Sequence, residues 1–193
     1  MQRAILLFGY PGSGKGTQGK ILSALPGFHH VAMGDIFRAL TPANPLFEKV
    51  QSYLKSGELV PDELTMDLLK RYVDDLKPDP EDFLIIDGVP RNGKQVALLN
   101  QIVQVVRIFK LSVYDEKLVV DRIRKRARAQ GRADDSKDEV ITRRLLVYRE
   151  ETEACIRSWP GTILTRIHAN QPIFDVHFDI IHALAKMRDI HFK

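Results

Sequence analysis

The chain has 193 residues, of which 44% are hydrophobic and 28% charged, a composition typical of one globular domain that excludes disordered, collagen-like and coiled-coil chains. The formal net charge is only +4, but eight of the sixteen arginines lie between Arg122 and Arg149, where they favour an anionic partner. The single cysteine, Cys155, excludes an internal disulfide and a multi-cysteine zinc site. No apolar run suits a bilayer span and we find no signal peptide, so we expect a cytoplasmic protein without a membrane partner.

Short apolar runs alternate with helical patterns along the chain. The runs predict buried strands at Ile5–Phe8, His30–Ala32, Phe83–Ile86, Val105–Val113 and Thr162–Ile167. Apolar residues spaced three and four apart predict helices over Leu64–Leu76 and Val176–Met187, and Pro61 suits a first helical turn. Continuously apolar strands that alternate with helices indicate an α/β fold whose parallel sheet has helices on both faces. Ligands of such sheets bind beyond the carboxyl ends of the strands.

Two segments interrupt this alternation. Residues 34–60 are helical but rich in proline and glycine, and residues 127–137 are polar, charged and turn-prone. Each segment is either a surface loop or a movable flap, and the pattern alone leaves both interpretations open.

A glycine-rich stretch, Gly9–Thr17, follows the first predicted strand and opens a helix. Glycines let successive backbone N–H groups converge on an anion, and the helix N-terminus adds partial positive charge. Lys15 then reaches the outer phosphates of a nucleotide. The stretch departs from the strict phosphate-loop pattern because Gly16 separates Lys15 from the hydroxyl of Thr17. This spelling, GxPGSGKGT, resembles the adenylate kinase branch of the nucleoside monophosphate kinases.

The acceptor side of that family has three counterparts here. Residues 33–38 resemble its TGDxLR segment, residues 56–62 resemble the segment that lines the acceptor's base and ribose, and residues 87–91 resemble its DGFPR segment. The resemblance implies phosphate clamps at Arg38 and Arg91, a magnesium-bound water at Asp87, and an adenine-binding amide at Gln95. The implied AMP-binding residues are Met33, Arg38, Glu58, Leu59, Val60, Gly88, Val89, Pro90, Arg91, Gln95, Arg132 and Arg144.

Two positions depart from the family on this side. Met33 stands where threonine is usual, and the hydroxyl of that threonine helps to recognise the base. Losing one neutral hydrogen bond costs on the order of 1 kcal/mol, so we expect weaker AMP binding. If Met33 faces the base, Met33→Thr should lower the AMP Michaelis constant, and an unchanged value would show that it does not. Val89 stands where phenylalanine is usual, which loosens packing beside the acceptor.

Residues 115–126 predict a helix on which Arg122 and Arg126 share one face. Gly131–Asp135 resembles the lid signature GRxDD, and Arg143-Arg144-Leu145 resembles the sequence that follows it. The resemblance places Arg122 against the ATP adenine and sets Arg126, Arg132 and Arg144 around the transferred phosphoryl group. For Arg124, Arg128 and Arg143 we prefer a solvent-exposed basic face. The implied ATP-binding residues are Gly12, Ser13, Gly14, Lys15, Gly16, Thr17, Arg122, Arg126 and Gln171, and the catalytic residues are Lys15, Arg91, Arg126, Arg132 and Arg144.

The resemblance therefore implies a phosphate-loop NTPase-like domain over residues 1–193, built on a parallel five-stranded sheet. It carries an NMP-binding insertion at 33–62 and a short lid at 126–137 that lacks the zinc ligands of some relatives. The expected reaction is Mg²⁺-dependent transfer from ATP to AMP, giving two ADP, by a monomer. Gln95 favours AMP, because UMP/CMP kinases typically carry asparagine at that position. The alternatives are a UMP/CMP kinase, which shares the phosphate machinery, and a nucleic-acid-binding module that uses the Arg122–Arg149 cluster, although we expect no nucleic-acid partner.

Overall fold

A parallel sheet forms the centre of the computed structural model, which describes residues 1–131 and 137–187. The strands are β1 (Gln2–Phe8), β2 (Phe28–Ala32), β3 (Phe83–Asp87), β4 (Val103–Ser112) and β5 (Leu164–His168). They lie in the order β2-β3-β1-β4-β5, and every neighbouring pair is parallel. The predicted five-stranded parallel sheet is therefore confirmed, with strand ends within about three residues of those expected.

The helices cover both faces of this sheet. They are α1 (Lys15–Leu22), α2 (Met33–Ala39), α3 (Phe47–Ser56), α4 (Asp62–Leu76), α5 (Gly93–Ile102), α6 (Glu116–Gln130), α7 (Asp138–Val147), the π-helical turn η2 (Tyr148–Thr152), α8 (Glu153–Cys155), the 3₁₀ turns η3 (Ile156–Ser158) and η4 (Gly161–Ile163), and α9 (Ile173–Ala185). Ala4, Leu6 and Phe8 of β1 join the core formed with α2, α4 and α5. Ile5 and Leu7 face the opposite core, formed with α1, α6, α7 and α9.

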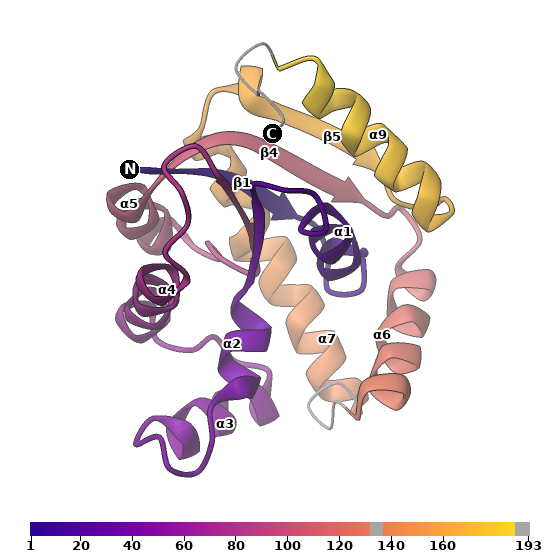
Figure 1. The fold of residues 1–193 in the computed structure, drawn as a ribbon. Helices are drawn as coiled ribbons and strands as arrows, with labels where there is room; N and C mark the ends of the chain where they lie inside the picture. The colour runs from indigo at the N-terminus through magenta and orange to yellow at the C-terminus, as the bar shows by residue number, and fades with distance from the viewer. Residues whose placement is uncertain (132–136, 188–193) are drawn as a thin grey trace.

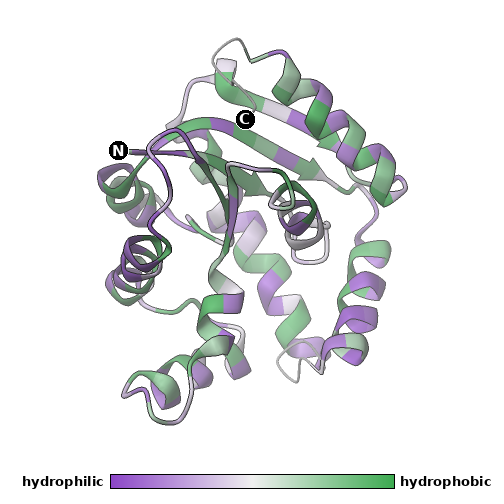
Figure 2. Cartoon of the chain, viewed as in Figure 1, coloured by the Kyte–Doolittle hydropathy of each residue, from purple (hydrophilic) through white to green (hydrophobic). Residues whose placement is uncertain are grey.

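The pattern of exposure explains where the helices lie. Successive residues of a strand point to opposite faces, so a stretch buried on both faces needs apolar residues at every position, as the stretch 4–8 of β1 has. Most helices carry both hydrophobic and hydrophilic residues, whereas the residues of α6 are largely hydrophilic (Figure 2). Only Val119, Ile123 and Ala127 of α6 are buried, and they recur every four residues.

The two interrupting segments differ from expectation at one boundary. Residues 34–60 contain α2 and α3, as their helical pattern indicated. The turn-prone character expected from residue 127 begins later, because α6 continues to Gln130 before Gly131 ends it with φ 61°. Ala127 extends the buried stripe of Val119 and Ile123, and that packing outweighs the polar composition of the segment.

Helices α2 and α3 lie opposite α6 and α7 at the same end of the sheet (Figure 1). Helix α2 starts directly after β2, and α6 starts shortly after β4, so this end carries the carboxyl ends of the strands. Across the described ranges, no helix is both long and apolar enough to cross a membrane.

Candidate functional site

A cleft of about 510 Å³ lies at the carboxyl ends of the strands, between α2 and α3 on one side and α6 and α7 on the other. Its size is that of a small-molecule site. The cleft brings together residues predicted from widely separated parts of the chain: Gly12, Ser13, Gly14, Lys15, Gly16, Thr17, Arg38, Glu58, Leu59, Val60, Asp87, Gly88, Val89, Pro90, Arg91, Gln95, Arg122, Arg126, Arg144 and Gln171. Arg132 lies outside the described residues. Met33 is described but does not line the cleft.

The phosphate loop joins β1 to α1. Gly14 precedes the helix with φ 103°, a left-handed conformation that glycine adopts without steric cost. No side chain caps the first turn of α1, so its backbone N–H groups remain available to an anion in the cleft. Lys15 Nζ donates to the carbonyl oxygens of Gly9 at 2.7 Å and Tyr10 at 3.0 Å. The lysine therefore lies folded across its own loop.

The environment of Lys15 disfavours its positive charge. Burial lowers the pKa of the ammonium group to about 8; the charges of Arg91 and Arg126 contribute to this shift, and Asp87 opposes it. A bound polyphosphate supplies the negative charge that this group lacks.

The phosphate loop also packs against the arginine-bearing helix α6. A Cβ atom at Gly12 would stand 2.9 Å from both Ile123 Cγ1 and the carbonyl oxygen of Val119, so only glycine allows this approach. The contact fixes the loop relative to Arg122 and Arg126 on the same helix. Arg122 donates from Nη1 to the carbonyl oxygen of Ala169 at 3.0 Å, which ties α6 to the turn before α9.

Three guanidinium groups gather at the acceptor end of the cleft. Arg91 follows β3 and donates from Nε to the carbonyl oxygen of Gly88 at 2.9 Å. Burial lowers the pKa of Arg91, and the charges of Arg144 and Arg38 act in the same direction. Arg38 pairs with Asp35 at 2.9 Å, and Arg144 donates from Nη2 to the carbonyl oxygen of Leu54 at 3.3 Å. The positive charges of these three guanidinium groups repel one another, and a shared anion such as phosphate would stabilise them.

The arginine cluster of residues 122–149 divides into two groups. Arg122, Arg126 and Arg144 line the cleft. Three others pair on the surface: Arg124 with Asp138 at 2.9 Å, Arg143 with Glu58 at 2.8 Å, and Arg149 with Glu116 at 3.0 Å. Arg128 is exposed. This division favours a compact anionic ligand over an extended nucleic-acid surface.

Asp87 suits a hydrated magnesium ion. It ends β3, and its Oδ2 atom lies 3.6 Å from where a Cβ atom of Gly16 would stand, so the carboxylate faces the first turn of α1. Magnesium commonly binds through one or two carboxylates plus waters and phosphate oxygens, and this arrangement provides one carboxylate beside the phosphate loop. In the described part of the chain, no group of three or more His, Cys, Asp or Glu residues could hold a metal by itself.

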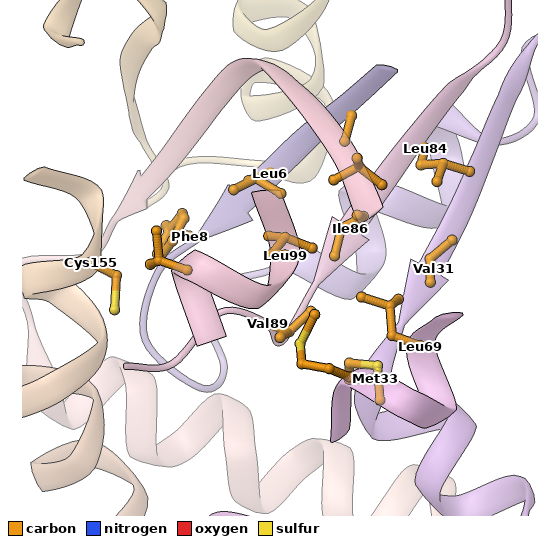
Figure 3. Close-up of a cluster of buried hydrophobic side chains, with 14 of the residues drawn as sticks. Leu6, Phe8, Val31, Met33, Leu69, Leu84, Ile86, Val89, Leu99 and Cys155 are labelled. Carbon is orange, nitrogen blue, oxygen red and sulfur yellow. The ribbon is translucent and has the colours of Figure 1, made fainter. Parts of the chain in front are cut away.

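The structure places Met33 in the core rather than along the cleft. Its side chain is 1% exposed and belongs to the core beside Val89 and Leu69 (Figure 3). A thioether carries no strong hydrogen-bonding group, so its favourable position is among apolar side chains rather than against a polar base edge.

Met33→Thr is therefore expected to weaken the fold rather than to improve AMP binding. Removing buried volume and burying a hydroxyl at this position should lower the free energy of unfolding by about 2–4 kcal/mol. The AMP Michaelis constant of the folded fraction should stay within about twofold of the original. Urea denaturation and steady-state kinetics measure the two quantities, and a clearly lower Michaelis constant would contradict the placement of Met33.

Among the cleft residues that the sequence analysis did not assign to the site are two from η2. Tyr148 and Thr152 line the cleft from η2, where the ring of Tyr148 lies 4.4 Å from that of Tyr10 and the hydroxyl of Thr152 donates to the carbonyl oxygen of Arg91 at 3.2 Å. They follow Arg144 by four and eight residues, so helical spacing from that arginine could have found both.

The chain is similar to known proteins along most of its length. The sequence model of the family described as "Adenylate kinase" matches residues 7–162. A protein named adenylate kinase from Corynebacterium diphtheriae is 36% identical over 183 residues, which cover 94% of this chain and 99% of the relative. Those so named from Cyanothece and Synechococcus are 37% and 38% identical, over 95% and 91% of this chain and 96% and 92% of their own lengths.

Proposed function

The chain belongs to the adenylate kinase family and is a nucleoside monophosphate kinase, and on this premise we propose that its cleft transfers a phosphoryl group reversibly from ATP to AMP, giving two ADP. The observation that carries the proposal is the convergence of Lys15, Arg38, Arg91, Arg126 and Arg144 on one cleft, from five separate segments. Such a ring of cations matches a row of phosphates shared by donor and acceptor.

The chemistry requires placement and charge neutralisation more than covalent assistance. The phosphate of AMP is already an anion, so its oxygen attacks without a general base. Arg38 and Arg91 hold that phosphate, while the N–H groups of α1 and Lys15 hold the donor's phosphates. Arg126 and Arg144 neutralise the charge that spreads over the phosphoryl group during transfer. The family resemblance implies the same role for Arg132.

A magnesium ion fits the donor end of this arrangement. Asp87 would hold it through water, and the ion would supply positive charge that neutralises the donor's phosphates.

Water must be kept from the donor, because an open site would transfer the phosphoryl group to water. We assign that role to the NMP-binding insertion at 33–62 and the short lid at 126–137. Of their described residues, Arg38 and Leu59 of the insertion and Arg126 and Gln130 of the lid line the cleft. Lys15 and Arg144 now donate to backbone carbonyls of Gly9, Tyr10 and Leu54. Exchange of these carbonyls for phosphate oxygens would couple nucleotide binding to closure.

The proposal is tested by the choice of acceptor. The protein is incubated with MgATP and, separately, with AMP, CMP, UMP or GMP, and ADP formation is measured. AMP should be the preferred acceptor by at least about tenfold in kcat/KM. Preference for UMP or CMP would instead identify a pyrimidine nucleotide kinase, and no ADP with any acceptor would contradict the proposal.

The shifted pKa of Lys15 predicts how ATP affinity depends on pH. Phosphates favour the charged lysine and so raise its pKa in the complex above the value of about 8 in the free protein. ATP affinity is then full below the pKa of Lys15 in the free protein. It falls as the pH rises above that value, because binding must then take up a proton. Calorimetry should show up to about a tenfold loss between about pH 7.5 and about pH 9. Lys15→Met should bind more weakly and lose this dependence, and an equal dependence in that variant would assign it to another group.

A further inference from the structure

The side-chain amide of Gln95 is held by one hydrogen-bond acceptor and one hydrogen-bond donor. Gln95 lies on α5, is 2% exposed and reaches the acceptor end of the cleft. Its Nε2 donates to Oδ1 of Asp62 at 2.9 Å, and its Oε1 accepts from the backbone N–H of Arg91 at 2.8 Å.

These partners fix which way the amide of Gln95 faces. The carboxylate of Asp62 only accepts hydrogen bonds, and the backbone N–H of Arg91 only donates them. Rotating the amide by half a turn would set oxygen against oxygen at Asp62 and N–H against N–H at Arg91. Both contacts would become repulsive, so one orientation is strongly preferred.

Asp62 is itself held in place. It is the first residue of α4, and its Oδ1 atom also accepts from Nδ2 of Asn92 at 2.9 Å. Asn92 in turn caps α5 by accepting from the backbone N–H of Gln95 at 2.9 Å. The starts of α4 and α5 are therefore joined through one carboxylate. The neighbouring carboxylate, Glu63, pairs instead with Lys94 and is exposed.

A fixed amide can distinguish nucleobases by the polarity of their hydrogen-bonding edge. Nε2 retains one hydrogen and Oε1 retains one lone pair beyond those already used. Adenine presents an amino donor beside a ring-nitrogen acceptor, whereas hypoxanthine presents a carbonyl acceptor beside an N–H donor. An amide free to rotate matches either edge, but one held in a single orientation matches only one of them in a given binding pose.

We propose that Asp62 is a specificity-determining residue, which selects the acceptor base by fixing the orientation of the Gln95 amide. It is a positioning residue, because it acts through Gln95. The inference rests on the proposed function, in which Gln95 binds the base of AMP.

The experiment compares AMP with IMP, which differs from AMP only at this edge of the base. The quantity measured is the ratio of kcat/KM for AMP to kcat/KM for IMP, with MgATP as donor. Asp62→Ala should lower this ratio by at least about tenfold, since a bidentate amide–base pair discriminates by roughly that factor. Asp62→Asn should lower it less, because its side-chain oxygen can still accept from Nε2. The ratio is independent of the fraction of protein that folds, and Asp62→Asn preserves the shape of the residue if Asp62→Ala is too unstable to assay.

Glu63→Ala is the matched control. It removes the same charge from the next residue of the same helical turn, whose carboxylate pairs with Lys94 rather than with Gln95, so its ratio should equal that of the unaltered protein. Equal losses with AMP and IMP in the Asp62 variants, or an equal change of ratio in Glu63→Ala, would overturn the inference. Failure of the unaltered protein to use AMP would contradict the proposed function instead.

Discussion

Arg144→Ala is expected to lower kcat by about a thousandfold, since an arginine on the transferred phosphoryl group contributes at least that factor in phosphoryl transfer. Arg144 lines the cleft from α7, and its charge is close enough to Arg91 to help lower the pKa of that group. The loss should fall mainly on kcat, because charge on the moving group develops in the transition state.

The adjacent arginine provides the control for this variant. Arg143 points to the surface and pairs with Glu58, and an exposed pair of this kind contributes less than about 1 kcal/mol. Arg143→Ala should therefore retain kcat within about threefold. Steady-state kinetics on both variants, with circular dichroism to verify folding, separates the two roles. Comparable activity in both variants would remove Arg144 from the mechanism.

Lys15→Met is expected to lower kcat/KM for ATP by about 10²–10³-fold, as the loss of one charged group at a transition-state oxygen typically does. The methionine side chain has similar length but carries no charge, so the shape of the phosphate loop should be preserved. Because the pKa of Lys15 is lowered to about 8 by burial, removing its charge should also stabilise the unliganded fold near neutral pH.

That opposite effect on stability makes the variant informative. Thermal unfolding without nucleotide should give an unchanged or higher midpoint for Lys15→Met, while its activity collapses. Lys117→Met, which removes the same charge from an exposed position at the start of α6, should leave both quantities close to the original. A folded Lys15→Met protein with normal activity would show that the lysine does not act on the phosphates.

Much of the fold could be predicted from the sequence, because its strands are buried on both faces. A run such as Ile5–Phe8 cannot alternate with polar residues when helices cover it from both sides, so the apolar run itself marks the strand. The phosphate loop could be predicted for a similar reason, since the conformation of Gly14 and the close contact of Gly12 with α6 require glycine at those positions. The arginine positions followed from motifs whose order along the chain matched the family.

The structure differs from the sequence-based expectations where tertiary packing decides the outcome. The polar segment after Arg126 remains helical for another turn because Ala127 joins a buried stripe that composition does not display. Met33 was assigned to the base by its place in a motif, whereas its apolar side chain lies in the core beside Val89. The link between Asp62 and Gln95 spans 33 residues and depends on how α4 and α5 start side by side, which no local pattern reveals.

The central claim is that guanidinium groups from separate segments and Lys15 meet around one row of phosphates. A crystal structure with AMP, magnesium and a non-hydrolysable ATP analogue tests it most directly. The account predicts that Lys15 Nζ leaves the carbonyl oxygens of Gly9 and Tyr10, that Arg144 leaves that of Leu54, and that both donate to phosphate oxygens, together with Arg38 and Arg91. A complex with both nucleotides bound, in which Lys15 and Arg144 keep their present backbone partners, would contradict it.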